Sequence, residues 1–267
     1  QKPNVTLDEA VENIDIGGPT MIRSAAKNMG WVTVVVDPTD YQKIIEEMGA
    51  EGVSYATRRH LAAKAFAHTA QYDTIIQEYL KEMPFAETLT LTYNKYYDLR
   101  YGENPHQMAC VYKELNNKDC NILNAKILQG KQLSYNNVND ADGALSTLKE
   151  FTEPACVVVK HANPCGVAVG EDITEVFVRA YNADALSAFG GIIALNLPCT
   201  EAIATEIIKV FAEIVLAPSY EPKALELLAQ KKNLRVLELG PITTKSPTHE
   251  YRHIEGGMLV QDMDILT

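Results

Sequence analysis

Segment 154–166 holds the residues whose types and spacing best suit catalysis. An apolar strand is expected to end on Lys160 and His161 and to lead into a Pro/Gly turn that contains Pro164 and Gly166. In α/β sheets, ligands bind at the carboxyl ends of strands. A neutral imidazole there could take a proton while the neighbouring ammonium stabilises a developing anion. The pattern leaves a second interpretation equally open, in which Lys160 is a solvated strand end and His161 satisfies the turn.

Cys165 lies four residues after His161, which raises the possibility of a cysteine nucleophile activated by histidine. Cysteines in turns are more often small buried residues, and we favour that interpretation. Pro164-Cys165 also matches half of the PCxxC signature of zinc deaminases, but the second cysteine and the HxE motif are missing. The sequence therefore predicts no metal site.

Two further segments could bind an anion. Arg100 and Tyr101 open a loop, 100–106, whose guanidinium and hydroxyl would suit a phosphate or carboxylate; a surface turn with one ion pair is the alternative. Asp15-Ile-Gly-Gly18 precedes a predicted helix whose N-terminus could also accept an anion, although a capped turn is the commoner explanation. Ser187-Ala-Phe-Gly-Gly191 could bring backbone amides close to a ligand, or could only tighten packing.

The composition limits the class of protein. The chain has 267 residues and a formal net charge of −11, which argues against a sequence-independent nucleic-acid binder. No apolar run reaches the roughly 20 residues of a membrane span, and no leader opens the chain. Its five cysteines show neither a disulfide framework nor a CxxC pair. We expect a soluble protein of a reducing compartment.

Hydrophobic periodicity predicts the elements that position these residues. A capping box at Thr6–Glu9 starts a short helix, and a second helix runs to about Asn28 with Arg23 and Lys27 one turn apart. Further helices are expected at 40–48, 54–83, 138–151, 173–182, 201–213 and 222–231. Strands are expected at 31–36, 108–112, 155–160, 191–196, 214–217 and 234–239, and a linker or domain boundary within 84–100. This alternation favours α/β layering around a largely parallel or mixed sheet.

Several stretches together resemble one family, the bifunctional purine-biosynthesis enzymes that join AICAR formyltransferase to IMP cyclohydrolase. They occur in the family's order from near the start to about residue 260. The matching stretches are Asp8–Thr20, Arg23–Asn28, Lys64–Ala70, Leu99–Gln107, Leu133–Asn137, Val159–Gly166 and Ser187–Gly191. So many long matches in register make coincidence implausible.

The resemblance implies a domain boundary near residues 85–98. It implies that residues 1–90 are the C-terminal part of an IMP cyclohydrolase domain with a methylglyoxal-synthase-like fold. Residues 91–267 would be the N-terminal part of an AICAR transformylase domain, built from cytidine-deaminase-like units without zinc. Family members are about twice as long as this chain, so the resemblance suggests an internal fragment that lacks both ends and is catalytically poor alone.

The resemblance also implies residue roles. His161 would accept the proton of the AICAR amine, Lys160 would stabilise the transition state of formyl transfer, and Lys27 would be the catalytic lysine of ring closure. Residues at positions that contact AICAR or the cyclohydrolase nucleotide are Arg100, Tyr101, Gly190, Glu213, Asp15, Ile16 and Gly17.

The implied reactions are formyl transfer from 10-formyltetrahydrofolate, a co-substrate, to the 5-amino group of AICAR, giving FAICAR, and dehydrative closure of FAICAR to IMP. The resemblance further implies a cytoplasmic homodimer that uses no metal and binds neither nucleic acid nor membrane. Two other functions remain open from the sequence: a non-catalytic module that binds AICAR or a nucleotide, and a hydrolase or amidase that depends on Cys165.

Overall fold

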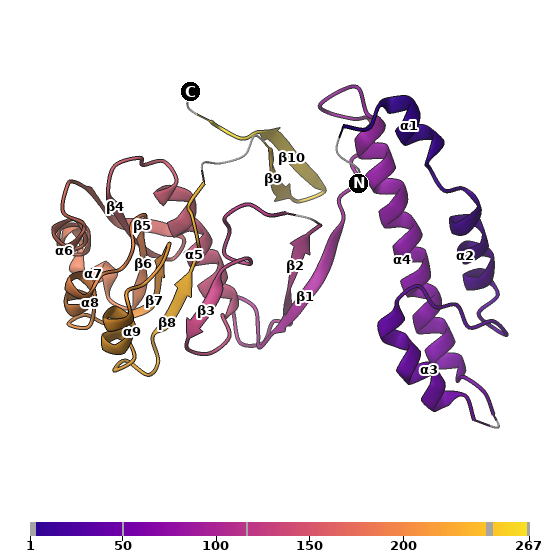
Figure 1. The fold of residues 1–267 in the computed structure, drawn as a ribbon, viewed down its shortest axis with the longest axis horizontal. Coiled ribbons are helices and arrows are strands. Elements are labelled where there is room, and N and C mark those ends of the chain that lie inside the picture. Colours follow the sequence, from indigo (N-terminus) through magenta and orange to yellow (C-terminus); the bar gives the residue numbers. More distant parts are fainter. Residues whose placement is uncertain (1–3, 50, 116, 244–247, 266–267) are drawn as a thin grey trace. The chain divides into compact units, whose positions relative to one another are not determined.

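The computed structural model describes residues 4–49, 51–115, 117–243 and 248–265. The chain divides into two compact units, Gln1–Thr92 and Tyr93–Thr267. The division falls at the start of strand β1 (Tyr93–Leu99). Residues 93–99, which the sequence predicted as part of a linker or boundary, are therefore a strand. Each unit is described separately below, with its elements labelled in Figure 1.

The first unit is helical in the residues described. Its elements are α1 (Leu7–Glu12), α2 (Gly17–Lys27), the 3-10 helix η1 (Pro38–Asp40), α3 (Tyr41–Glu47) and α4 (Tyr55–Leu80). The capping box is confirmed at α1, where the Thr6 side chain accepts from the Glu9 amide at 3.3 Å and the Glu9 carboxylate accepts from the Thr6 amide at 3.0 Å. Small residues let α2 and α4 pack closely, with Ala26, Ala62 and Ala65 buried together.

The strand expected at residues 31–36 does not form. Residues 32–37 belong to no helix or strand, and Trp31 is 89% exposed. Val34 alone is buried, against the alanines of α2 and α4. A strand needs a neighbouring strand for its hydrogen-bond ladder. Within the described part of this unit, residues 4–49 and 51–92, no other segment is a strand, so the apolar run packs against helices instead.

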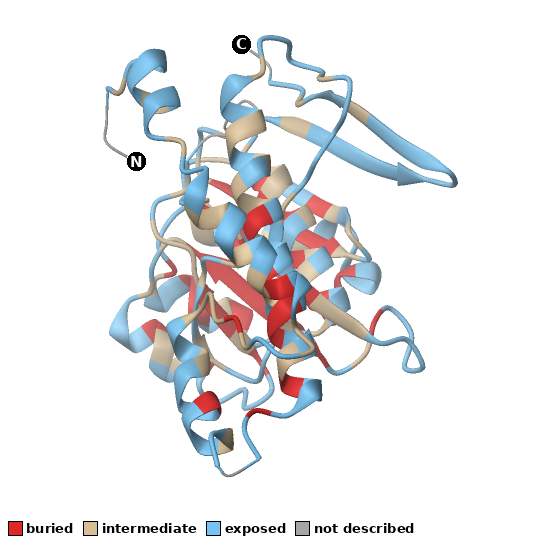
Figure 2. Cartoon of the chain, turned by 90° about the vertical axis from the view of Figure 1, so that its right-hand side faces the viewer, coloured by how far each residue is buried: buried red, intermediate tan, exposed pale blue. Residues whose placement is uncertain are grey.

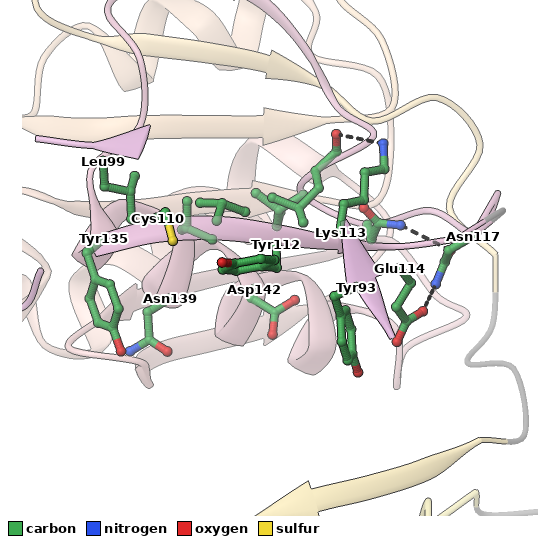
Figure 3. A pocket seen from close by; sticks show the side chains of 15 residues that line it. Tyr93, Leu99, Cys110, Tyr112, Lys113, Glu114, Asn117, Tyr135, Asn139 and Asp142 are labelled. Carbon is green, nitrogen blue, oxygen red and sulfur yellow. Dashed lines mark hydrogen bonds between the residues drawn. The ribbon is translucent and has the colours of Figure 1, made fainter. Parts of the chain in front are cut away.

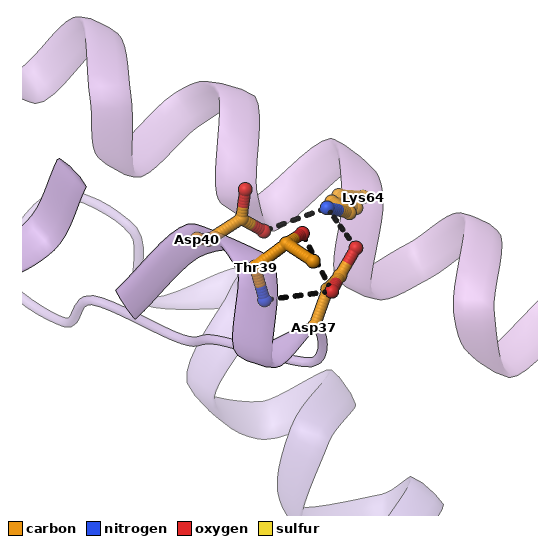
Figure 4. A network of polar contacts seen from close by, with 4 residues as sticks. All are labelled: Asp37, Thr39, Asp40 and Lys64. Atoms are coloured by element: carbon orange, nitrogen blue, oxygen red, sulfur yellow. Dashed lines mark hydrogen bonds and ion pairs between the residues drawn. The ribbon is translucent and has the colours of Figure 1, made fainter. Parts of the chain in front are cut away.

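An ion-pair network joins η1 to the long helix α4 (Figure 4). The Lys64 ammonium lies 2.6 Å from an Asp37 carboxylate oxygen and 2.7 Å from one of Asp40. The other Asp37 oxygen accepts from the amide and hydroxyl of Thr39 at 2.9 and 2.7 Å. The bond from Lys64, followed by those from Thr39, holds the pKa of Asp37 well below its usual range. In turn, the hydrogen bonds to Asp37 and Asp40 raise the pKa of Lys64.

The Lys64 network predicts a pH dependence of stability. A depressed carboxyl pKa stabilises the fold above the unfolded pKa of about 4, and this contribution is lost as the pH falls. The raised pKa of Lys64 contributes below about 10.4, so the network acts between these limits. We expect Lys64→Met to lower the free energy of unfolding near pH 7 and to lower it by less near pH 2, because the contribution of Asp37 disappears fully only below its depressed folded-state pKa. Urea unfolding at both pH values measures this, with exposed Lys43→Met on α3 as control; equal pH dependence of the two variants would contradict the assignment.

The second unit is built around a six-stranded sheet with the order β3-β8-β7-β6-β4-β5. Its strands are β3 (Lys126–Gln129), β4 (Ala155–Lys160), β5 (Asn163–Val169), β6 (Gly191–Leu195), β7 (Ala212–Ala217) and β8 (Arg235–Glu238). Strands β6, β7 and β8 run parallel, and the other neighbours are antiparallel. The mixed α/β architecture expected from the sequence is confirmed.

Helices cover both faces of this sheet. Helix α5 (Tyr135–Leu148) packs on one face. The other face is covered by α6 (Ile173–Ala183), α8 (Glu201–Ile207) and α9 (Pro222–Leu228), and the short α7 (Ala185–Ala188) precedes β6. Buried residues gather in the strands and on the helix faces against them (Figure 2). This double burial explains why β4 and β6 are continuous apolar runs.

Two expectations for this unit were wrong. The Pro/Gly segment after His161 is not a turn but strand β5, at the edge of the sheet, where a proline removes no needed hydrogen bond. The helix expected at 201–213 ends at Ile207, because residues from Ala212 onward pair as β7.

Two hairpins complete the unit, β1 with β2 (Ala109–Glu114) and β9 (His249–Ile254) with β10 (Gly257–Asp262). Among the described residues, no helix is both long and apolar enough to cross a membrane.

Candidate active site

His161 lies on the tight turn of the β4–β5 hairpin. Lys160 pairs with Asn163 across the hairpin, which leaves His161 and Ala162 as the two turn residues. Both have left-handed backbone angles, with φ of +63° and +62°. Hairpin turns with two positive φ values match the twist of the strands, but they usually use Asn or Gly. The structure therefore presents the histidine on an unusual, constrained turn.

Lys160 reaches across the end of β6. Its ammonium donates to the carbonyl oxygen of Phe189, and Gly190 lies beside it with φ of +73°. A Cβ at Gly190 would lie 3.0 Å from the Lys160 nitrogen and 3.0 Å from the ring of Phe211. The Gly190 amide donates to the Phe211 carbonyl at 2.8 Å. Two of the predicted site residues, Lys160 and Gly190, are thus side by side.

The position of these residues in the sheet differs from the one expected. Strand β4 is antiparallel to β6, so its carboxyl end meets the amino ends of β6 and β7. The candidate site is therefore not at the carboxyl edge of the parallel strands, where the general rule for α/β sheets places ligands. It is instead formed where the β4–β5 turn meets the first residues of β6 and β7.

Glu213 enters the same region through a β-bulge. Gly191 pairs with Ala212 and Ile192 with Ile214, which leaves Glu213 as the extra residue of β7. Its carboxylate accepts from the Asn137 side-chain amide at 2.9 Å. Asn137 is buried in the first turn of α5, where it also forms a capping box with Ser134. The start of α5 thereby fixes the direction of the Glu213 side chain.

Helix α5 also contacts the turn that carries His161. The Asp140 carboxylate accepts from the Ala162 amide at 2.8 Å. Gly143, one turn further along the helix, lies so close that a Cβ there would be 2.7 Å from the Ala162 carbonyl oxygen. Sequence reasoning did not assign roles to Asn137 or Asp140. The signal available for both was their spacing of three residues, which places them on one helix face.

The loop that holds Arg100 and Tyr101 approaches the same end of α5. Its backbone closes on itself, with the Gly102 amide donating to the Gln107 carbonyl at 2.8 Å. The Asn136 side chain, in the first turn of α5, donates to the Glu103 carbonyl at 3.5 Å. The Arg100 guanidinium is exposed and lies 5.8 Å from the centre of the Tyr101 ring.

The predicted residues of the first unit are spread along one helix. Asp15 lies just before the N-cap of α2; its carboxylate accepts from the Gly18 amide at 3.0 Å, and its own amide donates to the Tyr72 hydroxyl at 2.8 Å. Ile16 and Gly17 follow, with Ile16 72% exposed. Lys27 is the last residue of the same helix, about 15 Å from its start. The structure does not bring Lys27 together with Asp15, Ile16 and Gly17.

The geometry of Cys165 disfavours a nucleophilic role. Cys165 is the bulge residue of β5, since Val158 pairs with Gly166 and Val159 with Pro164. Its sulfur points to the Val158 carbonyl oxygen at 3.4 Å and packs against the core. Burial raises the pKa of the thiol, which lowers the population of the reactive thiolate.

A separate cavity of about 480 Å³ lies between the β1–β2 hairpin and α5 (Figure 3). Tyrosines, Asn139 and Asp142 line it, and none of the predicted site residues does. Across the described ranges, no cluster of three or more His, Cys, Asp or Glu side chains could hold a metal ion.

Comparison with known proteins identifies the family. The AICARFT/IMPCHase bienzyme model matches residues 25–267. The bifunctional purine biosynthesis proteins PurH of Bacillus cereus and Bacillus anthracis are each 53% identical to this chain over 270 residues. Each match covers 100% of the chain and 53% of the relative, so the chain spans about half the length of these curated relatives. The chain belongs to the AICARFT/IMPCHase bienzyme family.

Proposed function

We propose that this chain carries part of the machinery for formyl transfer to AICAR in its second unit and part of that for IMP formation in its first. In this proposal residues 1–90 belong to a cyclohydrolase domain with a methylglyoxal-synthase-like fold. Residues 91–267 belong to a transformylase domain with cytidine-deaminase-like units that lack zinc. Family membership supports both assignments.

The observation that carries the formyltransferase proposal is the meeting of Lys160, Gly190, Glu213 and the His161 turn around the start of α5. A substrate with a nucleophilic amine could be bound there by an ammonium, a carboxylate and an imidazole. Arg100 and Tyr101, on a loop at the same helix end, offer a guanidinium and a hydroxyl to the phosphate of the ribotide.

The proposed chemistry assigns one task to each basic side chain. The 5-amino nitrogen of AICAR attacks the formyl carbon of 10-formyltetrahydrofolate, and the carbonyl oxygen gains negative charge. His161 takes the proton lost by the amine, and the Lys160 ammonium stabilises the oxyanion. The bond from carbon to N10 then breaks and N10 takes up a proton, which gives FAICAR and tetrahydrofolate.

Ring closure of FAICAR to IMP with loss of water is assigned to the first unit. Asp15, Ile16 and Gly17 would contact the nucleotide, and Lys27 would shuttle protons. Lys27 lies at the opposite end of α2 from Asp15, Ile16 and Gly17. The pocket for ring closure therefore needs side chains from outside α2. We also infer that the working form is a cytoplasmic homodimer without a metal ion.

A formyl-transfer assay tests the proposal. It supplies AICAR and 10-formyltetrahydrofolate to two proteins, this chain and an extended protein. The extended protein contains this chain within a sequence as long as that of the relatives. We expect FAICAR from the extended protein and much slower turnover from the chain alone. AICAR binding without turnover in the extended protein would leave only a binding module. Activity that is lost on thiol alkylation and spared in His161 variants would favour the cysteine mechanism.

Gly190→Ala should separate site geometry from backbone strain. The new methyl group would displace the Lys160 ammonium and the Phe211 ring, in addition to straining a positive φ. Gly240 has a similar φ of +71° with open space around it, so Gly240→Ala is the matched control. We expect both variants to lower the melting temperature, Gly190→Ala by more because of its added contacts, but slower formyl transfer by folded extended protein only for Gly190→Ala. Equal rates for the two variants would contradict the placement of Lys160.

A further inference from the structure

The His161–Ala162 turn needs support from outside the hairpin. A left-handed backbone angle is unfavourable for an L-residue, and two successive residues adopt it here. Histidine is among the types enriched in this conformation, whereas alanine has no side-chain group to stabilise it. Within the hairpin, the pairing of Lys160 with Asn163 closes the turn, and the Asn163 side chain donates to the His161 carbonyl at 3.0 Å. Helix α5 adds support from outside the hairpin.

Helix α5 supplies a fixed carboxylate to this turn. Asp140 accepts from the Ala162 amide at 2.8 Å, and Gly143 leaves room for the Ala162 carbonyl against the helix. A hydrogen bond to an ionised carboxylate is about twice as strong as one between neutral groups. The core-facing residues that follow on α5, Ala141, Ala144, Leu145 and Leu148, are buried in the cluster that includes the sheet. The helix is therefore anchored, and the Asp140 side chain starts from a rigid backbone.

The same helix face holds a second site residue. Asn137 binds Glu213, and Asp140, three residues later, binds the turn after His161. These bonds tie the bulge of β7 and the turn of β4–β5 to one rigid element. The distance between the two segments is thereby set by α5 and not by the strands alone.

We propose that Asp140 is a positioning residue, whose carboxylate holds the Ala162 amide and thereby aims the turn that presents His161 to the substrate amine. The inference rests on the proposed formyl transfer and deepens it. Asp140 takes no part in the proton transfer itself. Its removal lets the His161 backbone relax away from the left-handed conformation, and a misplacement of about 1 Å can cost about 100-fold in rate.

The kinetic test uses Asp140→Ala and Asp140→Asn in the extended protein. Asparagine keeps an oxygen acceptor for the Ala162 amide, whereas alanine removes it. We expect Asp140→Ala to lower kcat for formyl transfer by about 100-fold with little change in the KM for AICAR. Asp140→Asn should recover most of that loss. Asp142→Ala, two residues along α5 and facing the other cavity, is the control and should retain the wild-type rate.

A spectroscopic test in this chain separates the inference from the proposed function. In Asp140→Ala, we expect the ring signals of His161 and the amide signal of Ala162 to shift in NMR spectra, while Asp140→Asn and Asp142→Ala leave the His161 ring near its wild-type position. An unmoved His161 ring in Asp140→Ala, or a kcat equal to that of Asp142→Ala, would overturn the positioning role. If the extended wild-type protein transfers no formyl group, the proposed function fails, and the His161 signals alone decide whether Asp140 sets the turn.

Discussion

Replacing His161 by asparagine is expected to slow formyl transfer by about 100- to 10,000-fold, the usual contribution of a general base. Asparagine accepts the left-handed backbone angle at this position, so the turn is preserved while the imidazole is lost. The KM for AICAR should change little, because the proposed site binds the phosphate through Arg100 and Tyr101 and not through His161. Steady-state kinetics of the extended protein measure both values.

His253→Asn is the matched control for this result. His253 is exposed on β9, outside the candidate site, and should leave the rate unchanged. If His161→Asn were as fast as His253→Asn, another group would have to accept the amine proton. A melting temperature near that of the wild type would show that the loss of rate does not come from unfolding.

The second large effect concerns stability. Gly166→Ala should destabilise the second unit by about 3 kcal/mol or more, at or beyond the upper end of ordinary overpacking. Gly166 lies in β5 under α6, and a Cβ there would be 1.8 Å from the Ala180 carbonyl oxygen. The new Cβ is fixed to the backbone of the strand, and the carbonyl belongs to the backbone of the helix, so neither can move aside without separating the helix from the strand.

Thermal unfolding measures this effect, with an expected fall in melting temperature of about 10 °C for a unit of this size. Gly257→Ala in β10 is the control, because nothing lies within 4 Å of the position that its new methyl group would take. A fall no larger than that of the control would show that α6 does not pack on β5 as closely as described. The same variant should lose formyl transfer only through unfolding.

Local patterns predicted the elements that carry their own signal. The strand at Ala155–Lys160 has the predicted bounds, and the capping box at Thr6 starts α1 as expected. The mixed sheet also follows from the alternation of apolar runs and helical periodicity. These features depend on residues close together in the sequence, so a single sequence contains them.

Features that depend on pairing between distant segments could not be predicted in this way. Residues 31–36 read as a buried strand, but a strand forms only with a partner, and none is present in the described part of that unit. The turn was expected at Pro164 and Gly166, because proline and glycine are stronger turn signals than histidine and alanine. It is Asp140, 22 residues away, that holds the turn at His161 and Ala162.

The candidate site was predictable in its residues but not in its geometry. Lys160 and Gly190 meet because β4 and β6 are antiparallel neighbours, and Glu213 joins them through a bulge. The position of the site at the amino ends of β6 and β7 has no local sequence signal. In the first unit, the separation of Lys27 from Asp15 follows directly from the length of α2.

A crystal structure of the extended protein with AICAR bound tests the central claim most directly. The account predicts the 5-amino nitrogen about 2.6–3.2 Å from an imidazole nitrogen of His161, with the Lys160 ammonium on the side where the formyl oxygen will lie. An AICAR amine that faces away from the β4–β5 turn, with His161 and Lys160 pointing into different surroundings, would contradict it.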